Sequence, residues 1–204
     1  MASFNTTLNV ILKNEGGYTC SFPGSGETYR GIDRNYSNDW QGWPIIDTLK
    51  RDGKIDPRCY KKAQIVNDRK LNDYVTNWYS SKIKTYFENF EGIKNQTLAD
   101  FTADFAWHKP FRLIPIVNSI AKQLAPAVQT SPNIVTNGVV AIMNLFPGEF
   151  YKRLRNTRIA YYNNPKSVNA SWDEKFITTK QGLLNRVNSF PSSISGGIFS
   201  FLFK

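Results

Sequence analysis

The segment from residue 4 to residue 18 reads FNTTLNVILKNEGGY, and it decides how the chain begins to fold. Its apolar residues recur at the i, i+4, i+7, i+8 spacing of one helix face: Phe4, Leu8, Ile11 and Leu12. Gly16 and Gly17 can take positive φ, which predicts that a first helix ends there. Glu15 then lies in the last turn of that helix.

Similar apolar stripes recur along the rest of the chain, and strictly alternating segments are nearly absent. The stripes are Leu71, Val75, Trp78 and Ile83; Leu98, Phe101 and Phe105; Phe150, Leu154 and Tyr161; and Trp172, Phe176, Leu183, Leu184 and Val187. Gly, Pro and Ser gather at 18–45 and 126–137, which predicts irregular segments there. The expected fold class is therefore mainly α, a helical bundle with an irregular Gly-rich segment that can include a small β element.

The length of 204 residues fits one compact domain or two small ones. A capping residue, Asn95 or Thr97, precedes Leu98 and predicts the start of a second half. We therefore expect domains at 1–95 and 96–190, followed by an apolar tail at 191–204. As a helix, the ten residues Ile194 to Phe203 would reach about 15 Å against a bilayer core of about 30 Å, so we expect a docking tail and no stable membrane span.

The charge balance points to a polyanionic partner. The chain has 26 Lys and Arg against 16 Asp and Glu, a formal net charge of +10. Residues 109–204 carry twelve basic and three acidic side chains, so the basic surface is expected mainly in the C-terminal half. Nucleic acid, anionic lipid and the bacterial cell wall all fit this charge. No helix-turn-helix, zinc or RNA-binding motif accompanies it, which argues against nucleic acid.

Two scarce residue types limit the chemistry. A single histidine, His108, leaves no multi-histidine metal site, and no metal or cofactor is expected. The two cysteines, Cys20 and Cys59, could pair once, but we expect inert thiols. A nucleophilic role for either cysteine with His108 matches no defensible spacing.

The position of Glu15 suggests that its side chain is a general acid. Unpaired carbonyls give a helix C-terminus partial negative charge, which disfavours the ionised form of a carboxyl group there. A general acid must hold its proton near neutral pH, so this position suits one. The alternative is a solvated last-turn residue beside a glycine cap.

Two further stretches, GETYRGI at 26–32 and WQGWPIID at 40–47, add a possible partner for this acid. Thr28, on a glycine-bounded turn, could hold the water or orient the sugar on the face opposite a glycosidase acid. Four aromatic residues nearby could be core or could stack on sugar rings: Tyr18, Tyr29, Trp40 and Trp43.

Together, the stretches at 15–18, 26–32 and 40–47 resemble glycoside hydrolase family 108, the lysozyme-like N-acetylmuramidases of phages and bacteria. The stretch RxxYY at 158–162 and GLLNRV at 182–187 look like the helical peptidoglycan-binding domain that follows in that family. The resemblance spans about residues 4–188 and implies a lysozyme-like catalytic domain with bacterial peptidoglycan as partner. It places the essential glutamate on Glu15 and the family's threonine on Thr28. With Gly31 added, the four aromatic residues form the expected substrate-binding set.

One departure concerns the second catalytic group. Many family members carry an aspartate in the loop between these two positions, but residues 19–26 here contain no acid. Glu27 and Asp33 are the remaining candidates. Retention needs two carboxyl groups about 5 Å apart and inversion about 6.5–9.5 Å. Retention through an enzyme carboxylate is least supported, while inversion and transglycosylation both stay open.

The leading hypothesis is an enzyme that cuts the β-1,4 linkage of peptidoglycan with Glu15 as general acid. The alternative, prompted by the missing loop aspartate, is a non-hydrolytic wall-binding or structural component of a phage or secretion particle. The first ten residues show no secretory signal. We therefore expect synthesis in the cytoplasm and action on the wall or periplasm after release by a holin, a secretion machine or a phage particle.

Overall fold

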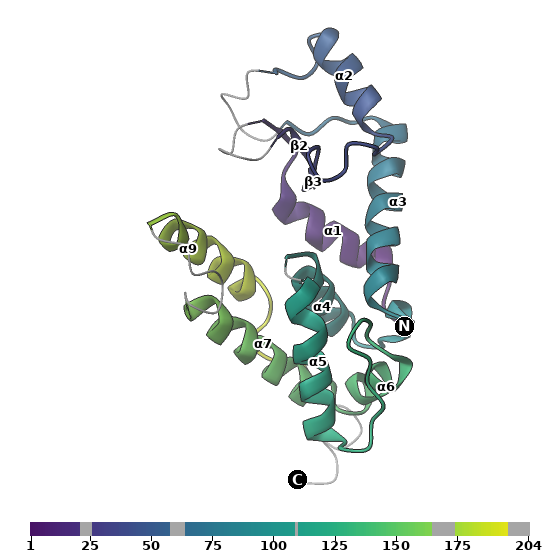
Figure 1. Cartoon of the computed structure of the whole chain (residues 1–204), viewed down its shortest axis with the longest axis vertical. Helices are drawn as coiled ribbons and strands as arrows, with labels where there is room; N and C mark the ends of the chain where they lie inside the picture. The colour runs from purple at the N-terminus through teal and green to yellow at the C-terminus, as the bar shows by residue number, and fades with distance from the viewer. Residues whose placement is uncertain (21–25, 58–63, 109, 165–173, 196–204) are drawn as a thin grey trace. The chain divides into compact units, whose positions relative to one another are not determined.

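The computed structural model describes residues 1–20, 26–57, 64–108, 110–164 and 174–195 (Figure 1). It is mainly helical, with a small three-stranded sheet, so the predicted mainly α, lysozyme-like fold class is confirmed. None of the described helices is long and apolar enough to cross a membrane. In chain order the elements are α1 (Phe4–Glu15), β1 (Tyr18–Thr19), β2 (Thr28–Tyr29), β3 (Ile32–Asp33), α2 (Trp43–Arg51), α3 (Arg69–Tyr86), the 3₁₀ helix η1 (Phe90–Gly92), α4 (Gln96–His108), α5 (Pro110–Leu124), α6 (Asn137–Leu145), α7 (Pro147–Asn163) and α9 (Glu174–Asn188).

The chain divides into two compact units. We call Leu8–Lys82 the N-terminal unit, and Met1–Thr7 with Ile83–Lys204 the C-terminal unit. This division falls before the boundary expected after residue 95. The reason is that residues 86–94 bond to the C-terminal helices and their connections. The Val135 amide donates to the Tyr86 carbonyl (2.8 Å), and the Lys94 amide donates to Asn144 Oδ1 (2.7 Å).

The Gly-rich segment of the N-terminal unit forms an antiparallel sheet in the order β1-β2-β3. A two-residue turn joins β2 to β3. Its residues have positive φ, 51° at Arg30 and 76° at Gly31, the pattern of the type I′ turn that suits the strand twist. The turn sets the register, because Tyr29 pairs with Ile32 and Thr28 with Asp33.

Cys20, directly after β1, forms a disulfide. The expectation of two inert thiols was therefore wrong; Cys59 itself lies outside the described residues. The physical reason is a backbone bridge between Tyr18 and Gln64, which brings Gln64 beside β1. Cys20 Sγ accordingly lies 3.0 Å from the Pro57 carbonyl oxygen. Spacing along the chain does not reveal this proximity.

Reduction should destabilise the protein, because the disulfide restricts the unfolded chain. We expect the Cys20→Ser variant to lose roughly 2–4 kcal/mol of unfolding free energy. Denaturant melts with and without dithiothreitol measure this. The reductant should shift the wild type to the curve of Cys20→Ser and leave the variant unchanged. A wild-type curve that does not respond to complete reduction would contradict the expectation.

In the C-terminal unit, α5 packs on α4 and α7, and α9 packs on α7 (Figure 1). Asp104 of α4 is fully buried and pairs with Arg158 of α7 (2.7 Å) and Arg186 of α9 (2.6 Å). Burial opposes ionisation of Asp104, but the two guanidinium charges outweigh it and lower the pKa of the carboxyl group. Three helices are thus joined through one carboxylate.

This cluster should make stability fall in acid. The pKa of Asp104 is lowered on folding, so its contribution is complete above the unfolded pKa of about 4 and is lost as pH falls through the folded value. We expect thermal melts to show a melting temperature that drops below about pH 4. Because the pair is buried, the drop should persist in about 1 M salt, which screens exposed pairs. If salt abolished the drop in melting temperature, surface charges and not the buried pair would be its cause.

Candidate active site

Glu15 ends α1, and its carboxylate lies against the turn between β2 and β3. A Cβ atom added to Gly31 would stand 2.6 Å from Glu15 Oε2 and 3.0 Å from the Tyr79 hydroxyl. Both oxygens are therefore neighbours of one point on the turn. Glycine suits this position for two reasons: its φ is positive, and a Cβ atom would force the Glu15 carboxylate to move.

Three hydrogen bonds hold the turn at the end of α1. Arg30 Nη1 donates to the Leu12 carbonyl (3.3 Å), the Arg30 amide donates to the Gly17 carbonyl (3.4 Å), and the Tyr79 hydroxyl donates to the Arg30 carbonyl (2.7 Å). Tyr79, on α3, is fully buried. Tyr79 was not predicted as a site residue, although it lies four residues after Val75 on the apolar stripe of its helix. Glu15 itself is half-buried.

The two faces of the sheet differ in character. Tyr18, Tyr29 and Ile32 share the buried face. Residues paired directly across an antiparallel sheet project to the same side, so Thr19, Thr28 and Asp33 form a row on the other face. All three are partly exposed. Two of the predicted residues, Thr28 and Asp33, thus lie side by side on the hairpin whose turn contacts Glu15.

Glu27, the other candidate for a second catalytic group, is held by three side chains. Its carboxylate accepts from the Tyr18 hydroxyl (2.7 Å) and pairs with Arg34 and Lys50. Burial would raise the pKa of Glu27, but the hydrogen bonds from Lys50, Tyr18 and Arg34 outweigh it and lower the pKa. Asp47 joins this network through both guanidinium nitrogens of Arg34 (2.8 and 2.7 Å). The network ties the hairpin to α2, so Glu27 has a structural task.

The four aromatic residues expected to stack on a sugar are buried instead. Their exposed fractions are 1% for Tyr18, 0% for Tyr29, 7% for Trp40 and 2% for Trp43. Tyr29 stacks on Trp40, and the two tryptophans meet edge to face. The indole N–H groups donate to the backbone, that of Trp43 to the Ser37 carbonyl (2.6 Å). Their polar tips are satisfied inside, and the rings form the core beneath the hairpin.

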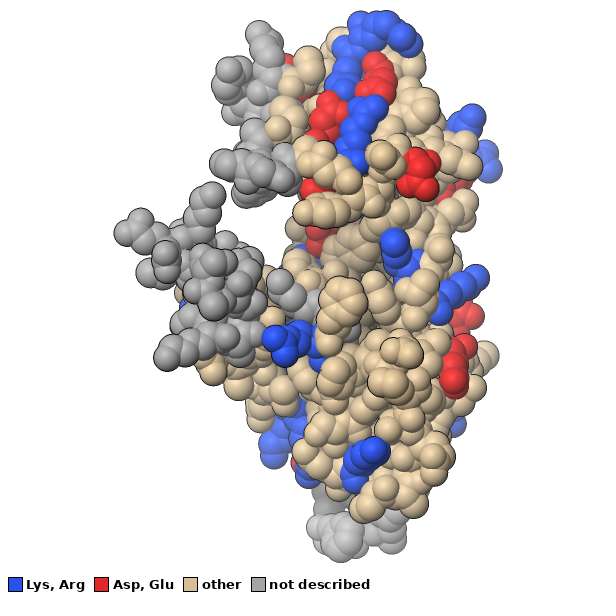
Figure 2. Space-filling view, in the orientation of Figure 1, with Lys and Arg blue, Asp and Glu red and all other residues tan. Residues whose placement is uncertain are grey.

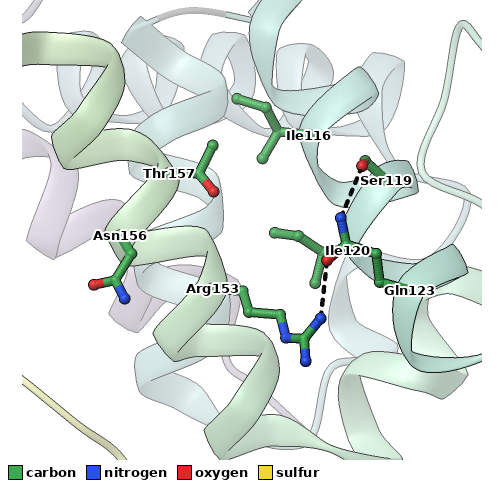
Figure 3. A pocket seen from close by; sticks show the side chains of 7 residues that line it. All are labelled: Ile116, Ser119, Ile120, Gln123, Arg153, Asn156 and Thr157. Carbon is green, nitrogen blue, oxygen red and sulfur yellow. Dashed lines mark hydrogen bonds between the residues drawn. The ribbon is translucent and has the colours of Figure 1, made fainter.

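A pocket of about 300 Å³ lies between α5 and α7 in the C-terminal unit (Figure 3). Its lining is Ile116, Ser119, Ile120, Gln123, Arg153, Asn156 and Thr157. Arg153 donates across the pocket to Gln123 of α5 (2.9 Å) and, along its own helix, to Glu149 (2.8 Å). The lining offers hydrogen-bonding groups but no carboxylate, so it suits binding better than acid catalysis.

Fewer basic side chains are available at the surface than the net charge suggests. Arg158 and Arg186 form ion pairs with Asp104 in the interior, and Arg153 pairs with Glu149. On the face shown in Figure 2, basic and acidic side chains interleave around α2, and the remaining basic ones are dispersed. On this face no concentrated basic patch is formed.

No family model matches the sequence, and no curated protein matches it. Among solved structures, the chain is similar to SagA of Brucella abortus, with 16% sequence identity and a TM-score of 0.49. The alignment covers 94% of this chain and 97% of that one.

Proposed function

We propose that the protein is a glycoside hydrolase that cuts the β-1,4 linkages of bacterial peptidoglycan, with Glu15 as general acid. The observation that carries the proposal is the contact between the Glu15 carboxylate and Gly31 at the tip of the Thr28 hairpin. A half-buried acid at a helix C-terminus is disfavoured in its ionised form, as a proton donor must be. The sequence resemblance supplies the substrate class.

In the proposed reaction each group has its own task. Glu15 gives its proton to the glycosidic oxygen as the bond to the anomeric carbon breaks. Thr28 faces outward from the sheet, and within the described residues its hydroxyl has no protein partner. It is therefore available to hold a water molecule or a sugar hydroxyl. The buried rings beneath the sheet keep the hairpin rigid, which catalysis by a positioned acid requires.

Digestion of purified sacculi tests the proposal. The wild-type protein should lower their turbidity and release soluble muropeptides. Mass spectrometry should find a reducing N-acetylmuramic acid end if water is the nucleophile, and a 1,6-anhydro end if the sugar's own hydroxyl attacks. Intact sacculi after exposure to folded protein across a range of pH would overturn the enzymatic proposal.

A second candidate function, non-hydrolytic wall binding, is favoured by the pocket between α5 and α7. Its polar lining lacks a carboxylate and belongs to a unit that does not contain Glu15. Cosedimentation with sacculi measures this function separately from cleavage. Binding without any released fragment would favour a wall-binding component over the hydrolase.

A further inference from the structure

The row on the outer face of the sheet contains a carboxylate that the ion-pair network leaves out. Asp33 follows Ile32 on β3, and its Oδ1 accepts one hydrogen bond, from the Asn35 amide (2.8 Å). Within the described residues it forms no ion pair, whereas Glu27 is held by two cations and a hydroxyl. Asp33 therefore has acceptor capacity to spare for a water molecule.

The register places Asp33 close to Thr28. Tyr29 and Ile32 flank the two-residue turn, and the Arg34 amide bonds to the Glu27 carbonyl (2.8 Å). The Thr28 and Asp33 pair lies between these two hydrogen-bonded positions and is thus a pair without cross-strand hydrogen bonds. The Cα atoms of such pairs are about 4.5 Å apart, and their side chains approach more closely than at the other sites. A single water molecule can therefore contact both.

The backbone separation between the acid and Asp33 can be estimated along the hairpin. Glu15 contacts Gly31, and Asp33 is two residues further on. Two residues of extended chain span about 6–7 Å. A backbone span of this size is compatible with the carboxyl separation of about 6.5–9.5 Å in inverting enzymes, which leaves room for water between the two groups.

We infer that Asp33 is the general base of an inverting hydrolysis, an inference that rests on the proposed function. Asp33 takes a proton from a water molecule that Thr28 helps to hold, and the water oxygen bonds to the anomeric carbon. The bond from that carbon to the glycosidic oxygen breaks, and the oxygen receives the Glu15 proton. Asp33 ends protonated and Glu15 ionised, and exchange with solvent restores both. The product carries the inverted, α anomeric hydroxyl.

The test compares three variants on soluble glycan strands released from sacculi. Asp33→Asn can keep the hydrogen bond to the Asn35 amide, so it should fold normally and cut about 100-fold or more slowly. Glu27→Gln should cut at close to the wild-type rate but unfold more easily. Asp39→Asn, at an exposed position in the segment between β3 and α2, is the matched control and should change neither property.

Two product measurements separate a base from a structural residue. Proton NMR of the first-formed wild-type product should show the α anomer. Azide should restore cleavage by Asp33→Ala and give a glycosyl azide of inverted configuration. A β product, or an Asp33→Asn variant as active as wild type, would overturn the role of Asp33 while leaving the hydrolase intact. A wild type that never cuts would remove both proposals.

Discussion

Replacing Glu15 by Gln should lower the rate of glycan cleavage by about 10²–10⁴-fold, the usual contribution of a positioned general acid. Gln has nearly the same shape as Glu but carries no proton that it can donate to a leaving oxygen. The side chain is half-buried at the end of α1 and fills the space beside Gly31, so the substitution should preserve the fold. Initial rates on soluble glycan strands, with melting curves of the same samples, measure both effects.

The matched control for this prediction is Asp52→Asn. Asp52 follows α2 in the same unit and is exposed. Its substitution makes the same change from a carboxyl group to an amide but should leave the rate within about twofold of wild type, since exposed substitutions seldom perturb the structure. Equal activity of the Glu15→Gln variant and the wild type would show that Glu15 is not the general acid.

The second large effect is expected from Gly31→Ala. The new methyl group would stand 2.6 Å from Glu15 Oε2, on a backbone whose φ is 76°. The carboxylate must move, and a displacement of about 1 Å in a catalytic group can cost about 100-fold in rate. We expect that loss or more, together with a stability decrease of about 1–2 kcal/mol from the strained backbone.

Gly53→Ala isolates the backbone strain. Gly53 also has positive φ, 68°, but a Cβ atom there would have nothing within 4 Å. We expect the two variants to lose similar stability from strain and only Gly31→Ala to lose activity. Similar activity in both would show that the contact with Glu15 is unimportant for the reaction.

The helices with clear stripes and caps were predictable from the sequence. α1 ends before Gly16 as expected, because Gly16 takes a φ of 66°. Asn95 caps α4, with its Oδ1 accepting from the Leu98 amide (3.0 Å). In both cases the local chemistry of one residue is sufficient to predict where the helix ends or begins.

Three helices, α2, α5 and α6, have no counterpart among the predicted stripes, and proline obscures two of them. α2 begins at Trp43 in a segment predicted to be irregular, and Pro44 lies in its first turn, where a missing N–H costs nothing. α5 contains Pro115 in its interior. In α5, tertiary packing outweighs the cost of the interior proline, and no pattern in the sequence predicts this.

The candidate site was predictable only in part. Glu15, Thr28 and Gly31 follow from short motifs, and the structure brings all three to one hairpin. Glu27 and the aromatic rings are held by partners such as Arg34, which is 7 residues from Glu27, and the Tyr74 carbonyl, which is 34 residues from Trp40. No motif in the sequence marks these partners, so these contacts are seen only in the folded chain.

The central claim is that the protonated carboxyl group of Glu15 donates its proton to a glycosidic oxygen over the Thr28 hairpin. A crystal structure of the Glu15→Gln variant with a bound glycan oligosaccharide tests it most directly. We predict that the amide of the substituted side chain lies within hydrogen-bond distance of the oxygen of the bond to be cut, with Thr28 on the opposite side of the sugar. An oligosaccharide bound only away from this hairpin would contradict the claim.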